Sequence, residues 1–254
     1  MSTTTVLARA GRAEWARIWS VRSSWVLVAC LGLFMVGVAV LAGIDAAGNP
    51  ESIPDDATGW DGARFTAMFA LFGMVALAVM TSTADHATGA IVPTLQWTPR
   101  RGLLFVARSL VIAVTVTLLG VVLVSLASVA MGLLAGVGLP LDDGLRSAGE
   151  LVVVLGCGAL LGIGLGLATR STAASLVLAI ALLLVLPLLV ANLPFEWATT
   201  VSSWLPGSGA LFLIFGEGPR DDMTVSAARL TMLAWAVGAS ALGALRLVRS
   251  DAGH

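Results

Sequence analysis

Long apolar runs separated by short polar segments dominate the sequence. Six runs come close to or exceed the roughly 20 apolar residues that an α-helix needs to cross a membrane. They cover residues 25–44, 65–83, 103–134, 151–168, 173–193 and 227–248. None shows the period-two alternation of a membrane β-barrel, and lipid cannot satisfy the hydrogen bonds of a non-helical backbone. The pattern therefore predicts an all-α integral membrane protein, with six transmembrane helices in one domain covering residues 1–254.

The segment before the first run has the pattern of an amphipathic helix. Within residues 1–23, Leu7, Trp15 and Trp19 share one side of a helix, while arginines spread over the rest of its surface. Such a helix lies in the membrane interface, with its arginines toward anionic headgroups. Two interpretations are open: a positively charged anchor, and an element that couples the chain to a partner.

Residues 84–102, between the second and third runs, predict a short helix along the membrane surface. Thr98 and Pro99 are suited to the N-cap and first position of the helix that follows. Asp85 is expected to be exposed in this segment, so its replacement should change stability by less than about 0.5 kcal/mol. A surface helix with a polar face offers a contact surface through which a soluble partner can move the membrane helices.

Residues 194–226 contain an apolar stretch that is too short to cross a membrane. Pro206 precedes it and Gly216 ends it, which predicts one or two short helices at the outer leaflet, with a helix from Trp204 to Gly216. A flexible loop is the alternative. If the segment covers the transport path as a gate, the gate residues are Trp204, Pro206, Leu211, Phe212 and Phe215.

Composition excludes several classes of protein. Hydrophobic residues make up 58% of the chain and charged residues only 11%, whereas soluble domains are about a quarter charged. All 14 basic residues are arginine, so the lysine of a phosphate-binding Walker loop is absent. We expect no ATPase or other enzyme activity from the chain alone, no bound cofactor or metal, and no nucleic-acid partner. Cys30 and Cys157 fall in apolar runs, and both are expected to be buried hydrophobes.

Arginine placement predicts the orientation. Cytoplasmic segments hold an excess of arginine over loops on the other side. With the N-terminus inside, ten arginines are cytoplasmic, against three carboxylates: Arg9, Arg12, Arg17, Arg22, Arg100, Arg101, Arg108, Arg170, Arg246 and Arg249. The outer segments hold four arginines and twelve carboxylates. Both termini are therefore expected in the cytoplasm of a cell whose inner (plasma) membrane holds the protein.

Glycines recur every fourth residue in the fourth run, at Gly158, Gly162 and Gly166. This spacing leaves one helix face as bare backbone, on which another helix can pack closely. Packing within the subunit is favoured over a dimer seam or a substrate path.

Several segments together resemble the membrane subunits of ABC-2 type ABC transporters, in their half-size, actinobacterial-looking form with six spans. "EWARIWSVRSSW" resembles the N-terminal connecting helix, and "DHATGAIVPTLQWTPRRGLLFVARSL" the coupling segment, although His86 stands where arginine or lysine is common. "GLATRSTAASLVL", "WLPGSGALF" and "RLVRSDA" match further segments in the same order. The resemblance covers nearly the whole chain.

The resemblance implies a permease dimer, formed with a second copy or a homologous permease, bound to two ATP-binding cassette ATPase subunits that carry ATP and Mg. The ATPases would dock on residues that couple them to the membrane helices: Glu14, Arg17, Asp85, His86, Thr88, Gly89, Arg100 and Arg101. The charge-free spans suit membrane lipids as surroundings and a small amphiphile, such as a drug, lipid or lipopeptide, as cargo.

Two other classes of function are open. A stand-alone secondary transporter or channel-like protein would need central charges or discontinuous helices in two related halves. Pro187 is the only interior break that the sequence indicates. A membrane regulator of an ATPase would move no substrate.

Overall fold

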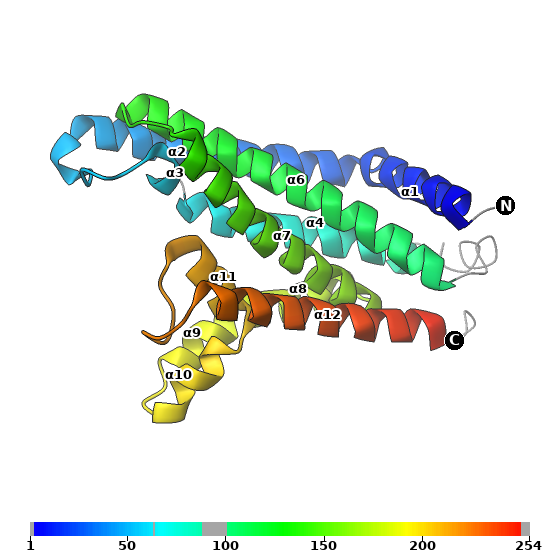
Figure 1. The fold of residues 1–254 in the computed structure, drawn as a ribbon. Coiled ribbons are helices and arrows are strands. Elements are labelled where there is room, and N and C mark those ends of the chain that lie inside the picture. The colour runs from blue at the N-terminus through cyan, green and yellow to red at the C-terminus, as the bar shows by residue number, and fades with distance from the viewer. Residues whose placement is uncertain (1–2, 63, 88–100, 250–254) are drawn as a thin grey trace.

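The computed structural model describes residues 3–62, 64–87 and 101–249, and the described chain is a bundle of helices without strands (Figure 1). The longer helices are α1 (Thr3–Ser20), α2 (Arg22–Gly48), α4 (Arg64–Ala87), α6 (Arg101–Ala135), α7 (Leu141–Thr169) and α12 (Val225–Arg249). The shorter ones are η1 (Pro50–Ser52), α3 (Gly59–Gly62), α8 (Thr172–Ile180), η2 (Ala181–Val185), α9 (Leu186–Ala191), α10 (Glu196–Ser203) and α11 (Pro206–Phe215).

Six helical segments are long and apolar enough to cross a membrane: Arg22–Gly48, Gly59–Asp85, Gly102–Ala135, Leu141–Thr169, Thr172–Ala191 and Val225–Arg249. The predicted all-α class with six candidate spans is confirmed. The largest shift of a boundary is in α7, which begins at Leu141 rather than at Leu151. Its first turn carries Asp142 and Asp143, and carboxylates there are favoured by the helix dipole. Polar residues that resemble a loop in sequence are therefore helical.

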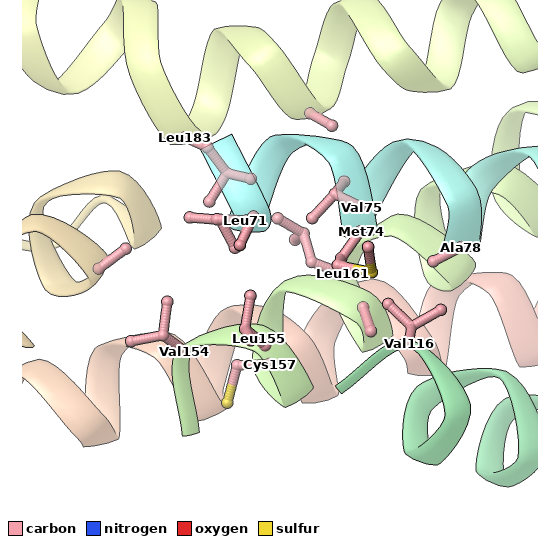
Figure 2. Packing of buried hydrophobic residues seen from close by; sticks show 14 of the residues in the cluster. Leu71, Met74, Val75, Ala78, Val116, Val154, Leu155, Cys157, Leu161 and Leu183 are labelled. Atoms are coloured by element: carbon pink, nitrogen blue, oxygen red, sulfur yellow. The ribbon is translucent and has the colours of Figure 1, made fainter. Parts of the chain in front are cut away.

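The core lies between α4 and α7. In the apolar window of α7, 67% of the residues are buried, compared with 17% in α2. Figure 2 shows Leu71 and Val75 of α4 beside Leu155 and Leu161 of α7. The outer helices α2, α8 and α12 present most of their surface outward, as expected of helices that face lipid.

The two cysteines differ in burial because they lie on helices at different distances from the core. Cys157 is buried, but Cys30 is exposed on α2. The expectation that both are buried is wrong for Cys30, because α2 packs on the bundle along only one side.

Different helix termini and different contacts lie at the two ends of the bundle. Helix α4 ends and α6 begins at one end, called here the Arg108 end, where α1 and the last turns of α12 also lie (Figure 1). Leu104 of α6 packs with Leu247 of α12 there. At the opposite end, called the Trp60 end, the indole N–H of Trp60 donates to the carbonyl of Pro140 (2.9 Å) and so joins α3 to the turn before α7.

The fifth span is not a regular α-helix. Ala181–Val185 forms a π-helical turn between α8 and α9. Pro187 follows in the next turn and has no N–H, so an unbroken α-helical hydrogen-bond ladder cannot form here. π-turns of this kind are frequent at functional sites.

Helices α10 and α11 form a pair bent by 80°. The chain enters the pair from α9 and leaves it toward α12, and at the bend the backbone meets α12. There the Trp235 indole N–H donates to the carbonyl of Trp204 (2.8 Å). Trp235 is ten residues from the start of α12 at Val225, or about 15 Å along the helix axis. The bent pair therefore has the length and composition of a broken span or of a re-entrant loop, with its bend beside α12.

Candidate functional site

Four charged side chains from three helices meet at the Arg108 end. Glu14 and Arg17 come from α1, Asp85 from the last turn of α4, and Arg108 from the second turn of α6. We call these four residues the charge cluster. Glu14 and Arg17 are three residues apart, so helical geometry places them on the same face of α1. The cluster joins α1 to the end of α4 and to the first turns of α6.

Each arginine in the charge cluster contacts both carboxylates. Arg17 Nη1 lies 2.5 Å from Asp85 Oδ1, and Arg17 Nη2 lies 2.7 Å from Glu14 Oε2. Arg108 Nη2 lies 3.1 Å from Glu14 Oε1 and also pairs with Asp85 Oδ2. Arg17 Nη2 additionally donates to the carbonyl of Thr81 (3.2 Å). The arrangement alternates in sign and balances two positive against two negative charges.

The charge cluster is shielded from solvent. Arg108 is 1% exposed, Asp85 5% and Glu14 6%, while the side chain of Arg17 is 27% exposed. Burying a charge costs several kcal/mol unless partners compensate for the lost hydration. The Nη1 atom of Arg108 is buried without a hydrogen-bond partner among the described residues. The cluster is therefore sensitive to any movement that separates α1, α4 and α6.

The structure thus brings together three of the predicted coupling residues, Glu14, Arg17 and Asp85. Thr88, Gly89 and Arg100 lie outside the described residues, and so do the side chains of His86 and Arg101. The expectation that Asp85 is exposed is wrong. Asp85 belongs to the buried end of α4, where it pairs with two arginines, and its replacement should cost far more than 0.5 kcal/mol.

Sequence reasoning missed Arg108 as a site residue and treated it only as one of the cytoplasmic arginines. A signal was present, because Arg108 falls five residues inside the predicted third run, 103–134. An ionisable residue inside an apolar run is by default a functional residue that needs a partner. Among the described residues, no group of three His, Cys, Asp or Glu side chains is placed to hold a metal ion.

The glycine stripe of α7 faces α4 within the same chain. A methyl group at Gly158 would lie 2.6 Å from Leu71 Cδ1, and one at Gly162 would lie 3.2 Å from the carbonyl oxygen of Val75. At Gly166 it would overlap Ser82. The absent side chains let the two core helices approach closely.

The predicted gate segment lies between two cavities at the Trp60 end. Phe212, with Trp60 and Arg64, lines one of about 210 Å³. Leu211 and Phe215 line the other, of about 230 Å³. Helix α11 thus has open volume on two sides.

Contacts hold the start of α11 in place. Pro206 is its first residue, and a methyl group at Gly207 would overlap the carbonyl of Leu183 in the π-turn. Ser202 Oγ donates to the carbonyl of Pro187 (2.9 Å). The start of α11 is therefore packed against the irregular part of the fifth span, whereas Trp204, just before it, is 65% exposed.

The loop after α11 is stabilised by an ion pair with two hydrogen bonds. Arg220 donates to both carboxylate oxygens of Asp222, at 2.8 and 2.6 Å. These hydrogen bonds, more than the charge of Arg220, lower the pKa of Asp222. Arg220 also donates to Thr200 Oγ1 (3.4 Å), which ties the loop to α10.

No protein-family model matches the sequence, and no curated protein is significantly similar to it. The fold and composition define the class: six long apolar helices that fit a multi-pass helical membrane protein.

Proposed function

We propose that the chain is the transmembrane subunit of an ATP-driven exporter of the ABC-2 type, driven by separate ATPase subunits and carrying a small amphiphile. The observation that carries the proposal is the charge cluster. It joins α1 to the end of α4 and the start of α6, and these two helices flank the segment 88–100 along the chain. A force applied to that segment or to α1 would therefore act on α1, α4 and α6 together.

The cluster would transmit this force because separating its helices is costly. Withdrawing α1 would leave Asp85 with Arg108 alone and would strip Glu14 of Arg108. Breaking a buried ion pair costs about 3–5 kcal/mol. Helices α1, α4 and α6 would then move as one unit when ATP brings the ATPase subunits together. In this proposal the Arg108 end faces the cytoplasm of a cell whose plasma membrane holds a permease dimer.

The Trp60 end would hold the outer gate. The bent pair α10–α11 packs against the π-turn of the fifth span, and α11 lies between two cavities. Rocking of the bundle would move the π-turn and carry α11 with it. Short segments on hinge residues commonly open and close over binding sites in proteins, and α11 would act on the transport path in this way.

A stand-alone secondary transporter is a second candidate, and two observations favour it. Buried carboxylates occur in the proton relays of membrane pumps and transporters, and Glu14 and Asp85 are buried. The π-turn with Pro187 interrupts the regular α-helical hydrogen bonding of the fifth span, and irregular spans occur in many secondary transporters. The helices α2, α4 and α6 of the first half show no comparable break in their described residues, which disfavours the paired breaks of an inverted repeat.

Reconstitution separates the candidates. The chain would be placed in liposomes alone, and together with a purified ATP-binding cassette ATPase subunit, and export of a fluorescent cationic amphiphile would be followed with ATP or with a proton gradient. We expect movement only with the ATPase and ATP. Movement of the amphiphile by the chain alone under a proton gradient would favour the secondary transporter. If the amphiphile does not move under either condition, the result would favour a membrane regulator of an ATPase.

A matched pair of variants tests the role of the charge cluster. Asp85→Asn should leave ATPase binding measurable but lower transport per ATP hydrolysed. Asp61→Asn is the control, since Asp61 also pairs with an arginine, Arg64 at 2.5 Å, but lies at the Trp60 end. Equal transport per ATP in both variants would contradict a coupling role.

A further inference from the structure

An apolar groove of about 510 Å³ runs along α6 beside α1. It is lined by Trp15 and Trp19 of α1 and by a row of α6 residues from Leu110 to Val122, and we call it the α1–α6 groove. Of the described residues that line it, all except Thr115 are apolar or aromatic. Leu110 is 55% and Val122 52% exposed, so the groove is open to the surroundings of the bundle.

The dimensions of the groove suit a lipid chain. Leu110 and Val122 are twelve residues apart, which is about 18 Å along a helix. This is close to the roughly 15 Å of hydrocarbon in one membrane leaflet. The volume is in the range of pockets that hold a single small ligand. The length and the apolar lining of the groove therefore suit one acyl chain.

Positive charge lies beside the aromatic end of the groove. Arg12, Trp15 and Trp19 are spaced three and four residues apart on α1, so they share one face of the helix. Arg12 is exposed, and the one carboxylate of α1, Glu14, is buried in the charge cluster. Tryptophan rings favour the level of the lipid headgroups, and arginines there attract anionic lipids.

We propose that the α1–α6 groove binds one anionic phospholipid, with an acyl chain along α6 between Leu110 and Val122 and the phosphate beside Arg12. Trp15 follows Glu14 in α1, and Val111 is three residues from Arg108 in α6, so the lipid lies next to the charge cluster and holds α1 against α6. The site does not depend on the proposed transport function, because it uses only contacts within this chain.

Native mass spectrometry of the purified full-length chain tests the site. Detergent-solubilised protein would be titrated with phosphatidylglycerol and with phosphatidylcholine of the same acyl chains. We expect one phosphatidylglycerol to bind more tightly than phosphatidylcholine. Arg12→Gln should weaken this binding by about fivefold, the change that corresponds to one arginine near an anionic lipid. Arg146→Gln, an exposed arginine of α7 away from the groove, should bind as the wild type does.

A second pair of variants tests the apolar part. Val122→Trp fills the groove, whereas Leu126→Trp lies one turn further along α6, outside the groove, and both positions are 52% exposed. Only Val122→Trp should abolish the binding. Equal binding of the two lipids, or equal binding by the two tryptophan variants, would overturn the proposal. So would conversion of a dimer to a monomer by Val122→Trp without loss of lipid, because the groove would then hold a second copy of the chain.

Discussion

Replacing Arg108 by methionine is the most direct test of the charge cluster. Methionine keeps much of the length and apolar contact of the arginine stem but removes its charge. Among the described residues, the variant leaves Glu14 and Asp85 buried with Arg17 as their remaining cation, and the Arg17 side chain is itself 27% exposed. Removing one partner of a buried ion pair costs about 3–5 kcal/mol, because the remaining charge stays desolvated. We expect Arg108→Met to lower the free energy of unfolding by this amount.

The assay is the unfolding of the detergent-solubilised chain, followed by circular dichroism in a denaturant titration and by heating. At about 2–4 °C per kcal/mol for a chain of this size, the melting temperature should fall by roughly 6–20 °C. Arg229→Met is the matched control. Arg229 also pairs with a carboxylate, Glu150, but its side chain is 47% exposed, and exposed pairs contribute about 0–1 kcal/mol.

A double variant makes the prediction sharper. Asp85→Leu combined with Arg108→Met removes one charge of each sign and leaves Glu14 paired with Arg17 at 2.7 Å. Replacing a whole buried pair by apolar residues is often neutral or stabilising. The double variant should therefore be more stable than either single variant. If Arg108→Met unfolds within about 1 kcal/mol of the wild type, or the double variant shows the summed loss of the single ones, the cluster is not a buried, mutually dependent set.

Three further predictions follow from other parts of the molecule. Gly164→Ala would place a methyl group against the backbone of Ala239 in α12, so it should cost about 1–3 kcal/mol in unfolding experiments. Gly37→Ala meets nothing within 4 Å and should be neutral or slightly stabilising; similar losses in both variants would contradict the packing of α7 on α12. The purified chain should not hydrolyse ATP, since it has no lysine for a Walker loop; turnover above that of a mock purification would refute this. Spin labels at Leu211 and Trp60 should change their separation when ATP is trapped in the assembled complex, and a fixed distance would make α11 a static cap.

Much of the fold follows from one-dimensional information. The six apolar runs predict the six candidate spans because a membrane helix needs only length and hydrophobicity, and both are properties of consecutive residues. The glycine spacing at Gly158, Gly162 and Gly166 likewise indicates a closely packed face, since helical periodicity is local. The short helix after Pro206 is also visible in the sequence, because proline at the first position and Gly216 after the end mark its limits.

Tertiary structure decided which polar groups meet. Arg108 is 94 residues from Glu14 and 23 residues from Asp85 along the chain. No local sequence pattern connects the three residues. Asp85 resembles a surface residue in sequence because it precedes a polar segment, yet the packing of α1 and α6 across the end of α4 buries it. Likewise, Cys30 and Cys157 lie in equally apolar runs, and only the central position of α7 and the peripheral one of α2 distinguish them. Burial depends on how helices pack against one another, and that is settled by contacts between distant residues.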